Sequence, residues 1–228
     1  MKRLIIFIIP FLLYSCRFAS IGTDHSRVDH KTPDIVNNKI NRLLYQKKNN
    51  ITDELNVKSI EHGVDSLEIR LWVISGKPKG GEVFIIRRTK YKWNCYHYWF
   101  LERVAEEDNM KKESFTLSEL ANVGLDTFWI KKEVPRTGWN GLMTKLNRSE
   151  LFKLDSYQDI SLEVVEKINS YSFILEYATK EKYRLYWYSC SDIYRDCQRC
   201  NELIQVLNVF NSEFNFSNSL FGNYRCKR

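Results

Sequence analysis

Two cysteine-containing pairs have residue types and spacings that could do chemistry. Cys197 and Cys200 have the CxxC spacing of a redox-active dithiol. They lie at the start of an expected helix, where the helix dipole would lower a thiol pKa. Cys95 and His97 lie two residues apart on one face of an expected strand. Their Cβ atoms should be about 7 Å apart, which is long for a thiol–imidazole hydrogen bond. These pairs define one hypothesis, a thiol-dependent enzyme.

The same cysteines have other interpretations. A four-thiolate zinc site would use Cys190, Cys197, Cys200 and Cys226. Structural zinc sites usually offer two close pairs, and only one CxxC is present. His25 and His30 lie in a polar segment without a third ligand of fixed position. Cys197 and Cys200 are also typical of small residues on a buried helix face, or of a structural disulfide. We therefore expect no metal and no cofactor.

Other catalytic motifs are missing from the sequence. It contains no Walker loop and no GxGxxG, GxSxG or HExxH motif. The carboxylates Glu106, Glu107 and Asp108 form a charged run, whereas a general acid needs an apolar pocket that raises its pKa. A non-catalytic protein is the prediction.

Aromatic residues are dense on the expected strands, and some alternate with cations. The residues that we expect to share an aromatic and basic sheet face are Tyr96, Tyr98, Arg184, Tyr186 and Tyr188. Tyrosine and arginine are enriched at binding hot spots, although a sheet also uses aromatic pairs for its own stability. This face predicts a protein, peptide or glycan partner. The formal charge of +7 is spread along the chain without a long basic block, so we expect no nucleic-acid partner.

The first sixteen residues have the organisation of a secretory leader. Lys2 and Arg3 precede an apolar run from Leu4 to Leu13 that only Pro10 interrupts, and Cys16 follows. The run is about half the ~20 residues that a membrane-spanning helix needs. A cleaved leader is therefore the expectation.

The segment Leu13-Tyr14-Ser15-Cys16 resembles the lipobox of bacterial lipoproteins. Leu13, Ser15 and Cys16 match the pattern, and Tyr14 is bulkier than usual. The resemblance implies cleavage before Cys16, acylation of Cys16 and attachment of the protein to a membrane. Arg17 stands where an aspartate would imply retention in the inner membrane, and no acidic export tag follows. The implied location is the periplasmic side of the outer membrane. An ordinary secretory signal with a chance cysteine is the alternative.

Periodicity predicts an α+β fold in one domain. Expected strands lie at 67–74, 82–88 and 91–101, as an antiparallel meander, and at 171–178 and 182–188, as a hairpin. Expected helices lie at 138–146 and 196–214, with short helical stretches at 35–45 and 117–123. This order is typical of an antiparallel sheet with two or three helices on one face.

The expected division of the chain has four parts. Residues 1–15 are the signal peptide, 16–64 a lipidated and flexible tether, 65–214 the folded domain and 215–228 a basic polar tail. The order of elements, including the tyrosine-rich strand at 182–188, is loosely similar to small bacterial lipoproteins without assigned function. That resemblance implies no activity.

Overall fold

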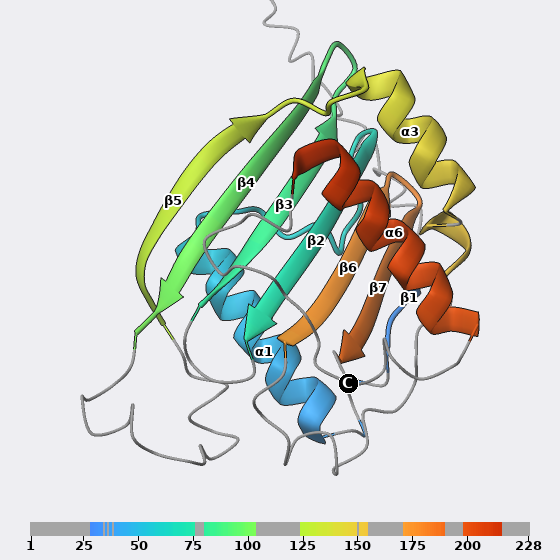
Figure 1. Cartoon of the computed structure of the whole chain (residues 1–228). Coiled ribbons are helices and arrows are strands. Elements are labelled where there is room, and N and C mark those ends of the chain that lie inside the picture. Colours follow the sequence, from blue (N-terminus) through green and yellow to red (C-terminus); the bar gives the residue numbers. More distant parts are fainter. Residues whose placement is uncertain are drawn as a thin grey trace, which may run out of the picture.

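A computed structural model describes residues 28–33, 35, 37, 39–75, 80–103, 124–149, 151–154, 171–189 and 198–215. Within these residues, seven strands form one open sheet with α-helices on both of its faces (Figure 1). This arrangement confirms the predicted α+β class. No described helix is long and apolar enough to span a bilayer.

The sheet is antiparallel except at one edge. The strands are β1 (Asp29–Lys31), β2 (Leu67–Ser75), β3 (Gly81–Arg88), β4 (Trp93–Glu102), β5 (Leu125–Glu133), β6 (Tyr171–Thr179) and β7 (Lys182–Ser189). Their spatial order is β1-β7-β6-β2-β3-β4-β5, and only the short β1 pairs in parallel, with β7. The predicted meander corresponds to β2, β3 and β4, and the predicted hairpin to β6 and β7. The edge strands β1 and β5 were not predicted.

Side chains alternate between the two faces of the sheet, as strand geometry requires. On β2, Ile69, Leu71 and Val73 belong to one buried cluster, whereas Trp72 and Ile74 belong to a second cluster on the opposite face. All five side chains are buried. Both faces of the central strands are therefore covered.

Three α-helices and a short 3-10 helix are described: α1 (Lys39–Glu54), α3 (Gly138–Arg148), η2 (Leu151–Lys153) and α6 (Gln198–Phe214). Leu142 and Leu146 of α3 and Phe210 of α6 complete the first cluster. Ile51 of α1 and Leu55 just beyond it complete the second. The prediction that the helices lie on one face is therefore wrong, because α1 covers the other face.

The folded body also begins earlier than expected. Residues 39–64, assigned to the flexible tether, include α1 and a loop whose apolar side chains, among them Val57 and Ile60, are buried against the sheet. The polar run Lys47-Lys48-Asn49-Asn50 suggested solvation, yet Lys47 and Lys48 are themselves buried. The tether prediction is wrong for residues 29–31, which form β1, and for residues 39–64, where carboxylates on the sheet neutralise the two buried lysines.

Candidate functional site

The five residues of the predicted binding face lie on two opposite faces of the sheet. Tyr96 and Tyr98 are half-buried on β4, and Tyr98 packs against the cluster beneath α1. Tyr186 and Tyr188 are buried on β7 in the cluster beneath α3 and α6. Arg184 shares their side of β7 and binds Asp29 of β1. The prediction that these five residues share one face is therefore wrong. Three strands separate β7 from β4, and the pairing registers between neighbouring strands decide which residues of the two strands lie on the same face.

Cys95 and His97 are both buried on β4, in surroundings that do not activate a thiol. Burial, with a smaller effect of Glu133, raises the pKa of the Cys95 thiol, which disfavours the nucleophilic thiolate. The His97 Nε2 lies 2.6 Å from Glu82 Oε2, and its ring stacks 3.6 Å from the Phe84 ring. Burial lowers the pKa of His97, although Glu82 opposes this effect. The described hydrogen-bond partner of His97 is thus Glu82, and the geometry lends no support to a Cys95–His97 catalytic pair.

The structure describes only some of the remaining candidate ligands and thiols. Cys16, His25, Cys190, Cys197 and Cys226 lie outside the described residues. Cys200 lies in α6. Among the residues that are described, no group of three or more His, Cys, Asp or Glu side chains could hold a metal ion.

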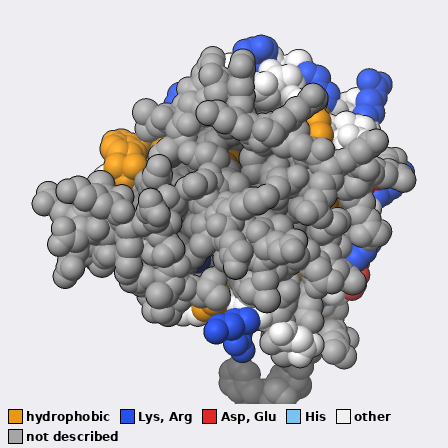
Figure 2. Space-filling model, turned by 60° about the horizontal axis from the view of Figure 1, so that its bottom comes forward, with side chains coloured by type: hydrophobic (Ala, Val, Ile, Leu, Met, Phe, Trp, Pro, Cys, Tyr) orange, Lys and Arg blue, Asp and Glu red, His pale blue; other side chains and the backbone are white. Residues whose placement is uncertain are grey.

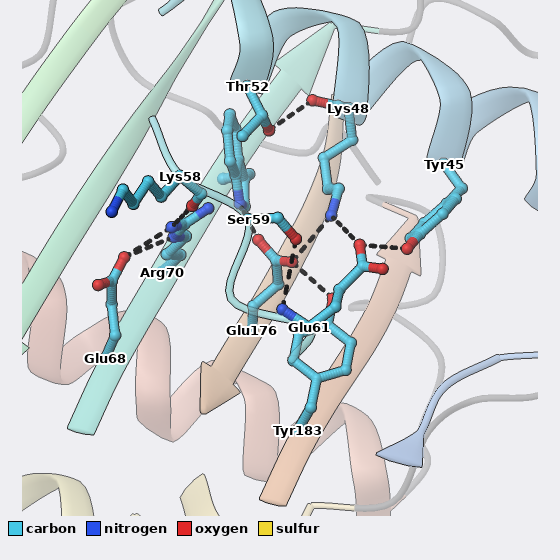
Figure 3. A network of polar contacts seen from close by, with 11 residues as sticks. Tyr45, Lys48, Thr52, Lys58, Ser59, Glu61, Glu68, Arg70, Glu176 and Tyr183 are labelled. Atoms are coloured by element: carbon cyan, nitrogen blue, oxygen red, sulfur yellow. Dashed lines mark hydrogen bonds and ion pairs between the residues drawn. The ribbon is translucent and has the colours of Figure 1, made fainter. Parts of the chain in front are cut away.

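A buried polar network joins α1 to the sheet, and its centre is Glu176 of β6 (Figure 3). The Lys48 ammonium donates to Glu176 Oε1 at 2.9 Å, and both side chains are buried. Trp72 Nε1 donates to the other oxygen at 2.6 Å, and the Tyr183 hydroxyl donates to Oε1 at 2.7 Å. Burial alone would raise the pKa of Glu176, but the charges of Lys48 and Arg70 and the hydrogen bonds lower it to about 2. Glu176 is therefore a permanent buried anion at neutral pH.

The network continues on both sides of Glu176. Lys48 also lies 3.7 Å from Glu61, which accepts a hydrogen bond from Tyr45. Arg70 forms a buried ion pair of 2.7 Å with Glu68. Lys48, Glu61, Arg70 and Glu176 line a cavity of about 170 Å³ between α1, the following loop and the sheet. Each of these four charges has an opposite charge beside it, so the ion pairs around this cavity connect α1 and the loop that follows it to the sheet.

A second set of polar contacts joins α1 to the strands β4 and β5. The Lys47 ammonium lies 2.9 Å from the carboxylate of Glu102 on β4, and both side chains are buried. Glu54 Oε2 accepts a hydrogen bond of 2.7 Å from the backbone N–H of Leu125, the first residue of β5. The last residue of α1 is therefore hydrogen-bonded to the first residue of β5.

The outer strand β5 carries the exposed apolar residues of the sheet. Phe128, Trp129 and Ile130 are 44%, 46% and 52% exposed, and they are consecutive, so they project from both faces. Lys131 and Lys132 follow and are also exposed. β5 pairs with β4 on one side, and no described strand pairs with its outer edge. We call residues 128–132 the β5 edge surface.

Figure 1 shows β5 at the margin of the molecule. In Figure 1, β5 forms the left edge of the sheet, whereas α6 crosses in front of the central strands. Figure 2, seen from the bottom of that view, shows hydrophobic side chains in orange as small separate groups, with lysine and arginine side chains in blue near the margins. Sequence reasoning missed this strand, although its aromatic and β-branched run is a strand signal.

The comparisons with known proteins do not assign this chain to a family. No family model, no curated protein and no solved structure matches it.

Proposed function

We propose that this protein is a lipid-anchored envelope protein whose domain is a non-catalytic binding module, and that it binds a partner chain along the β5 edge surface. The observation that supports this proposal most directly is the exposure of three consecutive large apolar side chains on a strand whose outer edge pairs with no other described strand. Sheet edges usually carry protective charges or are covered, because their free N–H and C=O groups can pair with another strand. A long apolar edge is therefore a strong candidate for strand addition.

Part of the predicted aromatic face adjoins this surface. On β4, Tyr98 lies opposite Ile130 and Tyr96 lies opposite Lys132. The rings of Tyr98 and Phe128 are 6.5 Å apart. A partner strand on β5 would thus continue an aromatic surface that starts on β4. Backbone pairing would supply affinity, and the aromatic side chains would supply specificity. This combination favours a protein or peptide partner over a glycan.

The opposite edge of the sheet is a poorer site for strand addition. β1 has three residues, and its ends are Asp29 and Lys31. Asp29 is already paired with Arg184 of β7. A short strand with charged side chains is the usual way in which proteins protect an edge. Binding at β5 is therefore the better proposal.

The lipid anchor rests on Cys16 and the lipobox resemblance of residues 13–16. Two or three acyl chains hold a protein on a bilayer for long periods, because each buried methylene contributes about 0.8 kcal/mol. The absence of an aspartate after Cys16 favours the periplasmic side of the outer membrane as its location. A binding module on such an anchor would meet its partner close to the membrane surface.

The anchor is tested by metabolic labelling. Cells that express the full chain and receive a palmitate analogue should label the wild-type protein, and Cys16→Ala should lose the label. Cys226→Ala is the matched control and should keep it, since only the lipobox cysteine is acylated. An unlabelled wild-type protein would exclude the lipoprotein proposal.

The binding surface is tested by site-specific photo-crosslinking of the full chain in cells. A photoreactive amino acid at Phe128 should form adducts, whereas the same group at the exposed Tyr91, outside β5, should form few. Adding Ile130→Lys should reduce the Phe128 adducts several-fold, because a charge replaces a central apolar contact. Tyr91→Lys is the control and should leave the Phe128 adducts unchanged. Equal adducts at Phe128 and Tyr91 would contradict the proposal.

A further inference from the structure

We infer that one end of the sheet docks on the anionic headgroups of the bilayer that holds the lipid anchor, with Tyr91 at the contact. This inference rests on the proposed function, because it requires an acylated Cys16. It adds an interaction surface that is distinct from the β5 edge surface, and it gives the anchored domain one orientation on the membrane. The surface consists of the turns at residues 88–92 and 179–182, and we call it the turn surface.

The pairing registers bring the two turns to the same end of the sheet. Thr179 ends β6 and lies opposite Leu67 of β2, which in turn lies opposite Arg88 at the end of β3. The β6–β7 turn and the β3–β4 turn therefore leave the sheet from one row of residues, at its upper end in Figure 1. Adjacent strands are about 4.8 Å apart, which places the centres of the two turns about 14 Å from each other. A membrane surface can contact both turns at once.

The turn surface is basic and exposes one aromatic side chain. Its cations are all exposed, and they are Arg88, Lys90, Lys92, Lys180 and Lys182. Glu181 is the one acid within these two turns. Two further acids lie close by: Asp29 is paired with Arg184, and Asp65 is exposed just before β2. Tyr91 lies between two of the lysines and is 85% exposed. Lysine and arginine bind anionic headgroups, and tyrosine is enriched at the level of the headgroups, so this composition favours a bilayer as the partner.

The β3–β4 turn is held in shape by hydrogen bonds within it. The backbone N–H of Thr89 donates to the Lys92 carbonyl at 2.8 Å, and the backbone N–H of Lys92 donates to Thr89 Oγ1 at 3.2 Å. The Lys90 ammonium lies 5.4 Å from the centre of the Tyr91 ring. The turn therefore presents its cations and its ring together, and docking needs little further ordering of the backbone.

The anchored segment enters the sheet at this same end. β1 is parallel to β7 with Asp29 opposite Lys182, and the backbone N–H of Asp29 donates to the Glu181 carbonyl at 2.8 Å. Cys16 and Val28 are twelve positions apart, so they can be separated by at most about 43 Å. Docking by the opposite end would use about 30 Å of this length to pass along strands of nine or ten residues. The length and the entry point of the anchored segment therefore favour docking by the turn surface.

The anchor makes a surface with few contacts sufficient. A short linker raises the effective concentration of a second binding site to the millimolar range. Each lysine or arginine near an anionic bilayer adds about fivefold to the affinity. We therefore expect the turn surface to be docked for most of the time in the acylated protein.

Lipid photo-crosslinking tests the contact. The acylated full chain is reconstituted into vesicles of phosphatidylcholine and phosphatidylglycerol, and lipid adducts are identified by mass. A photoreactive amino acid at Tyr91 should form several-fold more lipid adducts than the same group at Phe128. Phe128 is the matched control, because it lies opposite Phe100, which is about 23 Å along β4 from Trp93. Equal lipid adducts at the two sites would overturn the inference. Protein adducts in place of lipid adducts at Tyr91 in cells would also overturn it, since a protein would then be the occupant.

Charge reversal tests the basic residues. The double variant Lys90→Glu with Lys92→Glu should reduce the Tyr91 lipid adducts several-fold, and wild-type protein in vesicles of phosphatidylcholine alone should show the same reduction. The matched control, Lys39→Glu with Arg42→Glu, makes the same change of charge on exposed residues at the start of α1, at the lower end of the molecule in Figure 1, and should keep the adducts. Equal losses in the two double variants would overturn the inference.

The results separate failure of this inference from failure of the proposed function. If Cys16 is acylated and Tyr91 forms no lipid adducts, the docking is wrong, whereas the anchor is retained. If Cys16 is not acylated, the palmitate labelling overturns the anchor, and this inference with it. Protein adducts at Phe128 test the β5 edge surface independently of both results.

Discussion

Replacing Glu176 by glutamine is expected to lower the free energy of unfolding by about 3–5 kcal/mol, the cost of breaking a buried ion pair. Glu176 is buried and accepts hydrogen bonds from Lys48, Trp72 and Tyr183. Glutamine keeps the shape and one acceptor oxygen but removes the charge. The Lys48 ammonium then stays buried, with Glu61 at 3.7 Å as its nearest remaining carboxylate.

Urea unfolding of the full chain, with secondary structure as the signal, measures this effect. The matched control is Glu181→Gln, an exposed glutamate between β6 and β7, which should change the free energy of unfolding by less than about 0.5 kcal/mol. Trp72→Phe, which removes one donor to Glu176, should fall between the two variants. A Glu176→Gln protein within about 1 kcal/mol of wild type would mean that the network does not hold α1 to the sheet.

The central strands and the last helix could be predicted because each follows one clear period. The alternation along β2 places Ile69, Leu71 and Val73 on one face, and this is visible in the sequence. In α6, Leu203, Val206 and Phe210 recur at helical spacing and are buried. For these elements, local patterning and tertiary packing agree.

The predicted helical stretch at 35–45 covers only the first part of α1, and the burial of this helix against the sheet could not be predicted by the same reasoning. Its buried side chains include Lys47 and Lys48, and a lysine is almost never buried unless it is paired. The partners, Glu102 and Glu176, are distant in sequence and become neighbours only once the sheet has formed. Hydrophobicity patterns contain no information about such pairs, so the helix was expected to be a largely flexible tether.

The candidate site was only partly predictable for a related reason. Alternation within one strand separates its two faces, but the relative phase of distant strands depends on every register between them. Tyr96 and Tyr98 lie beside the β5 edge surface, whereas Tyr186 and Tyr188 are core residues of the opposite face. Choosing a common face for β4 and β7 required the register across three intervening strands. The exposure of β5 likewise follows from its place at the end of the strand order.

The second large effect is a loss of folding stability that we expect when the pH is lowered. Wild-type protein should lose about 3 kcal/mol of stability as Glu176 becomes protonated, because its pKa falls from an ordinary value of 4.5 to about 2 on folding. A carboxylate whose pKa is lowered by folding stabilises the folded state above its unfolded pKa. That contribution declines as the pH falls from 4.5 towards 2. Glu176→Gln has no such group, so its stability should change less over this interval.

The difference between the two proteins isolates this one carboxylate. Other folded-state acids also titrate in this range: hydrogen bonding to Arg184 lowers the pKa of Asp29, and bonds from Lys145 and Thr137 lower that of Glu213 despite partial burial. Their titration is common to both proteins and cancels in the difference. We expect chemical unfolding at a series of pH values to show a difference in free energy of unfolding between wild type and Glu176→Gln. This difference should be constant near neutral pH and should shrink as the pH falls towards 2. A gap that does not change with pH would show that the Glu176 charge contributes nothing, and that glutamine destabilises the protein through shape or hydrogen bonding alone.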